Sequence, residues 1–102
     1  MELRKQVRSI VLQLPTPDRW DIGRQAARAA LAIPAIIAEG QGRPGREDFK
    51  NDVSMAHGEG AELDTHLVAI LEDYPRLKDP IDIAMDLLDQ TSRMIMALSK
   101  KL

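Results

Sequence analysis

The sequence contains no cysteine, which excludes disulfide bridges, thiolate metal sites and cysteine nucleophiles. Aromatic residues are also scarce, with Trp20, Phe49 and Tyr74 as the only three. A core must therefore be built from aliphatic side chains and alanine, which suit helices. No apolar run approaches the roughly 20 residues needed to cross a bilayer, and the charged beginning of the chain does not resemble a signal peptide. These absences predict a cytoplasmic protein without a membrane segment.

The chain also lacks a recognisable catalytic or cofactor-binding motif. Gly40, Gly42 and Gly45 follow a predicted helix rather than a strand, and no Lys-Ser/Thr pair ends the segment, so they indicate a turn and not a phosphate loop. His57 and His66 have no cysteine or serine partner in a catalytic arrangement. We therefore predict a non-enzymatic protein that needs no cofactor.

A metal site is the alternative to consider, because Glu39, Glu59, Glu62 and His66 all fall on predicted helices. Di-iron bundles use Glu-x-x-His motifs on two helices. Here Glu62 and His66 are four residues apart, and the last predicted helix has no histidine. We predict no metal site, and we expect Glu39 and Glu62 to be partly buried carboxylates that pair with an arginine or accept hydrogen bonds from amides.

The 102 residues are enough for one domain, which we place at residues 1–102, and its apolar residues recur at helical spacing. A first helix spans residues 3–14 and ends at Pro15. The Thr16-Pro17-Asp18 sequence, with a hydroxyl available for capping, predicts the start of a second helix that runs to about Gly40. Pro34 interrupts the apolar run, so we predict one helix that is kinked there.

Glycines and a proline at residues 40–45 predict a turn, after which a third helix begins near residues 46–48. This helix carries a coiled-coil-like seam at Phe49, Val53, Ala56, Gly60, Leu63, Leu67 and Ile70. Tyr74 and Pro75 end it, and Asp79 with Pro80 predicts a capped start for a fourth helix. The seam of the fourth helix consists of Ile81, Ala84, Leu88, Thr91, Ile95 and Leu98.

Four helices joined by short loops predict an all-α fold, an antiparallel up-down-up-down four-helix bundle. The second and fourth helices carry more apolar residues than one core requires, which predicts homo-oligomerisation. The residues expected at the oligomer interface are Ile33, Ile36, Ile37, Ile83, Leu87 and Met94.

The formal net charge of −2 argues against a uniformly basic nucleic-acid-binding protein, but basic residues are grouped along the chain. The residues predicted to bind nucleic acid are Arg4, Arg8, Arg24, Arg28, Arg43, Arg46 and Lys50. Repetition of a small basic patch around an oligomer would strengthen phosphate binding. The alternative is that these residues are solvated or form ion pairs with Glu47, Asp48 and Asp52.

Residues 25–43 resemble the small four-helix bundle proteins encoded in ribosomal RNA intervening sequences, a family that includes the accessory variability determinant of diversity-generating retroelements. The family shows Gln-x-x-Arg-Ala-Ala, then Ile-Pro-x-x-Ile-Ala-Glu-Gly and Gly-Arg, and this sequence follows that pattern closely. Phe49, the segment Ala56-His57-Gly58 and the segment from Glu62 to Leu67 match the family's third helix. The similarity extends roughly from Thr16 to Leu98, although the first helix is shorter than is usual in the family.

The resemblance implies a homopentameric ring with a basic channel or face and, in retroelements, a partnership with a reverse transcriptase and nucleic acid. The sequence hypothesis is therefore a non-enzymatic oligomeric accessory protein that binds RNA or DNA, with a reverse transcriptase as a candidate partner. A structural oligomer or protein-interaction scaffold that does not bind nucleic acid is the alternative, and the acidic net charge favours it.

Overall fold

The computed structural model describes all 102 residues, and all of its secondary structure is helical. The elements in chain order are α1 (Glu2–Val11), α2 (Thr16–Asp18), the π-helical turn η1 (Arg19–Gly23), α3 (Arg24–Gln41), α4 (Arg46–Asp73), the 3-10 turn η2 (Pro75–Leu77) and α5 (Lys78–Lys100). The segments α2, η1 and α3 follow one another without a gap and form one long rod. No helix combines the length and the apolar content needed to cross a membrane.

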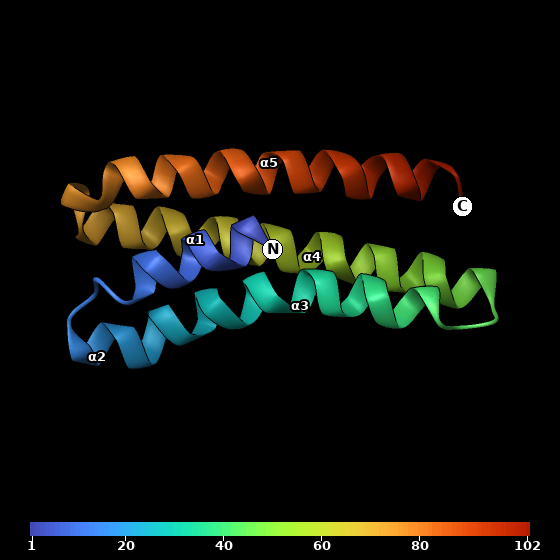
Figure 1. Ribbon diagram of the computed structural model, residues 1–102, viewed down its shortest axis with the longest axis horizontal. Helices are drawn as coiled ribbons and strands as arrows, with labels where there is room; N and C mark the ends of the chain where they lie inside the picture. Colours follow the sequence, from blue (N-terminus) through green and yellow to red (C-terminus); the bar gives the residue numbers. More distant parts are fainter.

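The helices pack as an antiparallel four-helix bundle, which confirms the predicted fold class. The α3 and α5 helices lie on either side of α4, and α1 packs against both α3 and α5 (Figure 1). The molecule is elongated, measuring 44 × 22 × 19 Å. The 10-residue α1 is much shorter than the 23-residue α5, so it covers only part of the bundle's length.

One cluster of 19 buried apolar residues forms the core. The seam predicted for the third helix is confirmed on α4, since all of its members are buried except Phe49, which packs at the edge of the core. On α5, Ile81, Ala84, Leu88 and Ile95 are buried, while Thr91 and Leu98 are partly exposed. The 3.5-residue spacing therefore identified the core faces of both long helices.

The helix ends differ from the predictions by up to three residues, the largest difference being at α1, which ends at Val11 and not at Leu14. Pro15, and not Thr16, occupies the N-cap of α2, and no side chain caps that helix. The α5 helix begins at Lys78 because the η2 turn leads directly into it, so Asp79 and Pro80 lie within its first turn. Both Pro17 and Pro80 occupy positions whose N–H groups have no partner within a helix, so the prolines do not disturb it.

The prediction of a single kinked second helix is confirmed around Pro34. The α3 helix continues through this proline without a break, and its axis bends in Figure 1. Proline lacks the N–H that would bond to the carbonyl of Ala30, so the helix bends instead of ending.

The π-helical turn η1 was not predicted, and it brings the rod close to the end of α1. Gly23, its last residue, is buried. A Cβ atom at this position would lie 2.9 Å from Val11 Cγ1 and 3.3 Å from Leu14 Cδ1. Any larger residue at this position would therefore force the Val11 side chain to shift.

Replacement of Gly58 by alanine is expected to stabilise the protein by about 1 kcal/mol, because glycine disfavours a helix interior. A Cβ atom at Gly58 would have no neighbour within 4 Å, so the change adds no clash. For a domain of this size the midpoint of thermal unfolding should rise by about 4–8 °C, as measured by circular dichroism. The control Gly23→Ala should give no such rise, because its new methyl group meets Val11.

Candidate nucleic-acid interface

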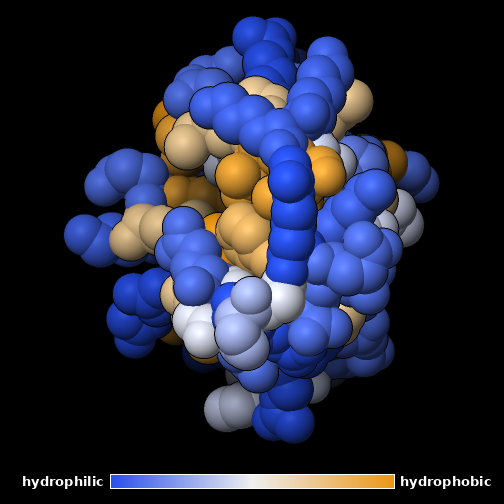
Figure 2. All heavy atoms as spheres, turned by 90° about the vertical axis from the view of Figure 1, so that its right-hand side faces the viewer, coloured by the Kyte–Doolittle hydropathy of each residue, from blue (hydrophilic) through white to orange (hydrophobic).

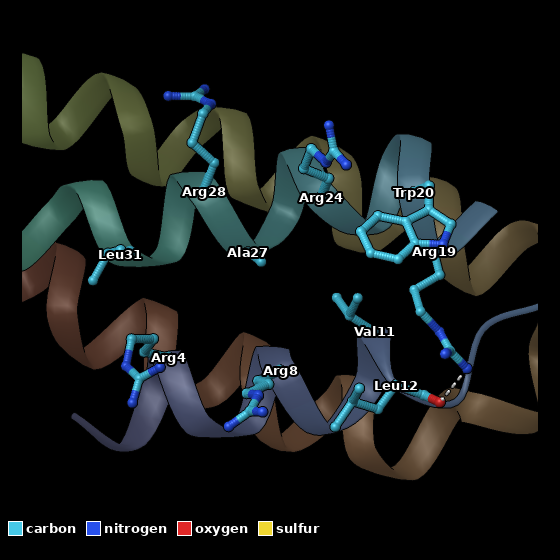
Figure 3. Close-up of a pocket in the computed structure, with 10 residues that line it drawn as sticks. All are labelled: Arg4, Arg8, Val11, Leu12, Arg19, Trp20, Arg24, Ala27, Arg28 and Leu31. Carbon is cyan, nitrogen blue, oxygen red and sulfur yellow. Dashed lines mark hydrogen bonds between the residues drawn. The ribbon is translucent and has the colours of Figure 1, made fainter. Parts of the chain in front are cut away.

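A groove with a volume of about 530 Å³ runs between α1 and the rod formed by α2, η1 and α3 (Figure 3). Five of its ten lining residues are arginines, and none is acidic. We call it the arginine groove; it is lined by Arg4, Arg8, Val11, Leu12, Arg19, Trp20, Arg24, Ala27, Arg28 and Leu31. In a chain with a net charge of −2, this is a local concentration of positive charge.

Two pairs of arginines, each spaced by four residues, border the groove. Arg4 and Arg8 lie one turn apart on α1, and Arg24 and Arg28 lie one turn apart on α3 (Figure 3). None of the ion pairs in the structure includes Arg4, Arg8 or Arg24. These three guanidinium groups are therefore available to an anion.

The other three predicted nucleic-acid-binding residues form a separate group at the turn between α3 and α4. The α3 helix, about 27 Å long, separates them from Arg24. Arg43 Nε lies 3.2 Å from Asp52 Oδ2, and Arg46 donates a 2.9 Å hydrogen bond to the carbonyl oxygen of Lys101. Lys50 is exposed. The seven predicted residues thus belong to two separate surfaces. Arg43 forms an ion pair with Asp52, as the alternative interpretation of the basic residues expected.

The groove also contains two residues that the sequence analysis did not select, Arg19 and Trp20. Both lie on η1. Arg19 donates hydrogen bonds of 3.0 Å and 3.2 Å to the carbonyl oxygens of Leu12 and Leu14, which ties the rod to the loop after α1 (Figure 3). Trp20 is 61% exposed, and the Cζ atom of Arg24 lies 5.2 Å from its ring centroid. A sequence signal was present for Trp20: it is the only tryptophan and lies four residues before Arg24, which is one helical turn.

Arg28 differs from the other arginines because carboxylates of α4 hold it. It donates a 2.9 Å hydrogen bond to Glu62 Oε1 and lies 3.5 Å from Glu59 Oε1. In Figure 3 its side chain points away from α1. The attraction of Glu59, followed by the hydrogen bond to Glu62, raises the pKa of Arg28. These contacts offset much of its charge, so Arg28 contributes less to the groove than Arg4 and Arg8 do.

The carboxylate of Glu62 is shared between Arg28 and His66, whose Nε2 atom lies 3.4 Å from Glu62 Oε1. The hydrogen bond from His66 lowers the pKa of Glu62, and Arg28 adds to the effect, while partial burial opposes it. The predicted pairing of Glu62 with an arginine is therefore confirmed. Glu39 is exposed, so its predicted partial burial is wrong, because α3 turns this residue towards solvent. No three His, Asp or Glu side chains are grouped as a metal site would require.

Because folding lowers the pKa of Glu62, its ionised form stabilises the folded state above the unfolded pKa. This stabilisation is lost as the pH falls through the folded pKa. We expect the unfolding temperature of Glu62→Gln to fall less than that of the parent protein between about pH 5 and about pH 3. Thermal unfolding across this range is the measurement, with Glu72→Gln as the control because Glu72 is exposed and forms no ion pair. Parallel curves for the parent and Glu62→Gln proteins would contradict the assignment.

A second surface lies beyond the N-terminus of α1, where no helix covers the gap between α3 and α5. The surface is hollowed into a groove with a volume of about 600 Å³, which we call the apolar groove. Its apolar lining consists of Met1, Leu3, Ile33, Pro34, Ile37, Ala38, Leu87, Met94, Ile95 and Leu98. Figure 2, which views the bundle from its C-terminal end, shows apolar side chains exposed between polar ones.

The residues predicted at the oligomer interface fall partly on this groove. Ile37, Leu87 and Met94 line it, and Met94 is 72% exposed. Ile33 is only 2% exposed, so it belongs to the core and forms the floor of the groove. Of the remaining two, Ile36 packs at the edge of the core and Ile83 is exposed on α5.

Comparison with known protein families gives one match, to the family described as 23S rRNA-intervening sequence protein. The match covers residues 1–97, which include both grooves except for Leu98. Comparison with curated proteins gives no match. The family found is the one that the motif in residues 25–43 indicated.

Proposed function

Since the chain belongs to the family of 23S rRNA-intervening sequence proteins, we propose that it is a non-enzymatic, homo-oligomeric accessory protein that binds RNA or DNA through the arginine groove. The observation that carries the proposal is the groove itself, whose lining has no carboxylate and includes three arginines, Arg4, Arg8 and Arg24, that form no ion pair. Guanidinium groups bind phosphate oxygens with good geometry, and phosphate contacts dominate the affinity for nucleic acids.

The distribution of charge supports this assignment despite the acidic total. Four aspartates on α5 are exposed at a spacing that places them along one side of the helix: Asp79, Asp82, Asp86 and Asp89. The arginine groove lies instead between α1 and the rod. None of the four aspartates lines the groove, and two of them, Asp82 and Asp89, pair with Lys78 and Arg93, so they do not neutralise the arginines of the groove by direct contact.

Self-association is the second part of the proposal. The apolar groove and the exposed Ile83 and Met94 leave apolar surface that a second copy would cover. A ring would also repeat the arginine groove, so that one RNA molecule contacts several copies and binds more tightly than a single groove allows. We propose a homopentamer and a cytoplasmic location on the basis of the family resemblance.

A reverse transcriptase is a candidate partner on the same basis alone. Co-purification of this chain with a reverse transcriptase encoded beside its gene would support the retroelement branch of the family. The alternative function is a scaffold that assembles without nucleic acid, and the apolar groove together with the acidic side of α5 favours it.

Size exclusion coupled to light scattering distinguishes these functions. The protein is measured alone and with a structured RNA, at low salt and at physiological salt. We expect an oligomer whose mass increases with RNA, most strongly at low salt, because phosphate binding weakens as salt rises. An oligomer that ignores RNA would support the scaffold, and a monomer would contradict the proposed assembly.

A further inference from the structure

Trp20 is not part of the hydrophobic core. Among the large hydrophobic residues that are exposed it is the only aromatic one, with 61% of its surface accessible. It belongs neither to the core nor to its partly buried edge, and it does not line the apolar groove. Its indole ring lies instead at one end of the arginine groove, beside Arg24 (Figure 3).

The turn that carries Trp20 is fixed on several sides. Gly23 packs against Val11 and Leu14, and Arg19 bonds to the carbonyl oxygens of the loop after α1. The Tyr74 hydroxyl donates a hydrogen bond to the carboxylate of Asp18, one residue before the turn. An aromatic ring on such an anchored turn loses little conformational freedom when a ligand binds, which favours affinity. Single π-helical turns occur frequently at functional sites.

The Arg24 guanidinium lies over one face of the Trp20 ring, with its Cζ atom 5.2 Å from the ring centroid, and the exposed ring is available to a base on its other side. Aromatic rings and guanidinium planes are the two side-chain surfaces on which unpaired nucleic-acid bases stack. Arg4 and Arg8 on the opposite wall have no acidic partner and are available to phosphates. Stacking and phosphate binding are therefore placed on the two walls of one groove.

We propose that the arginine groove selects single-stranded nucleic acid, with an unpaired base stacked on Trp20 and neighbouring phosphates bound by Arg4 and Arg8. This inference rests on the proposed nucleic-acid function and names the substrate class of that site. Inside a duplex, neighbouring base pairs cover the base faces, so only the duplex ends can offer a face to Trp20. The lining has no Asn, Gln, Asp or Glu side chain, the types that pair with adenine and cytosine edges, so the lining offers no contact that selects these two bases.

Trp20 is the only tryptophan of the chain, so its intrinsic fluorescence reports on this one position. The probes are a short oligoadenylate in RNA and in DNA form, the matching duplexes, and an abasic strand with the same number of phosphates. We expect both single strands to quench the fluorescence and the duplexes and the abasic strand to leave it nearly unchanged. Binding is measured in parallel by the anisotropy of a dye on each probe.

The variant Trp20→Ala is expected to weaken single-strand binding about 5- to 150-fold, the range that one stacked base contributes. Trp20→Phe should restore most of the affinity because it keeps an aromatic face. Met55→Ala is the matched control, since Met55 is 58% exposed on α4 outside both grooves and its loss should change binding little. Circular dichroism verifies that each variant is folded.

The outcomes separate this inference from the proposed function. If no probe binds the parent protein, the nucleic-acid function fails and the inference fails with it. If the probes bind but the fluorescence is unchanged, or if Trp20→Ala binds like the parent, the inference alone is overturned. Equal quenching by duplex and single strand would also overturn it, and so would a Trp20→Ala variant that changes only the oligomer mass.

Discussion

Replacement of both Arg4 and Arg8 by glutamate is expected to weaken RNA binding on the order of 100-fold at low salt. Both arginines line the arginine groove, and neither has an acidic partner in the protein. Their loss removes two phosphate contacts, and the new carboxylates repel the RNA. For a single-stranded ligand, the slope of log affinity against log salt should fall in magnitude by about 1.4, because each contact contributes about 0.7.

The position of the charge, and not its total, is what this experiment tests. The control Lys100→Glu with Lys101→Glu makes the same change in net charge at the C-terminal end of the chain, away from the groove. It should retain nearly the affinity of the parent. Equal weakening by both double variants would mean that overall charge controls binding, and it would remove the groove from the proposal.

Arg4 and Arg8 are a better test than Arg24 and Arg28 for a structural reason. Glutamate at Arg28 would stand beside Glu59 and Glu62, which now bind the guanidinium. Three carboxylates in contact would disturb the packing of α3 on α4. A loss of binding in that variant would then not distinguish a damaged fold from a lost phosphate contact.

Met94→Asp is expected to break the oligomer into folded monomers. Met94 is 72% exposed in the protomer, so the aspartate does not affect the core. In the proposed assembly the same position lies in an apolar contact, where an unpaired carboxylate costs several kcal/mol. We expect the dissociation concentration to rise at least about 100-fold, which corresponds to ~2.7 kcal/mol. Light scattering over a dilution series measures it.

The matched control for this variant is Met55→Asp. Met55 is 58% exposed on α4 and lies outside the apolar groove. Its replacement introduces the same charge on an exposed methionine, so the oligomer should persist. If Met94→Asp leaves the mass unchanged at every concentration, the interface lies elsewhere. Unfolded protein is not expected from either variant, and circular dichroism tests this directly.

The core and the order of the helices followed from the sequence because they depend on local periodicity. The apolar seam residues of α4, from Val53 to Ile70, recur at a spacing that puts them on one face of a helix. This spacing can be recognised without knowing which helix packs against that face. Pro15, Pro75 and the segment around Gly42 mark the ends of helices, because proline and glycine disfavour a continued helix whatever lies nearby. These signals need no knowledge of the neighbouring helices.

The arginine groove could not be predicted from the sequence, because it is created by tertiary packing. Arg4 and Arg8 were selected on charge alone, and only the docking of α1 against the rod places them opposite Arg24. The π-helical turn holds more residues per turn than an α-helix, so it changes the direction of the side chains that follow. A pattern with a constant period of 3.6 residues does not reveal this change, and Arg19 and Trp20 were missed for that reason.

The short α1 helix has a consequence for how the two grooves depend on each other. Met1 and Leu3 lie on the wall of the apolar groove, and Arg4 and Arg8 lie on the wall of the arginine groove. A partner that contacts Met1 and Leu3 therefore contacts the same helix that carries the arginines, with Arg4 as the next residue and Arg8 one turn further on. By thermodynamic linkage, any factor by which subunit association changes the affinity for RNA is also the factor by which RNA changes subunit association. In the proposed assembly, this coupling would make RNA and subunits dissociate together on dilution.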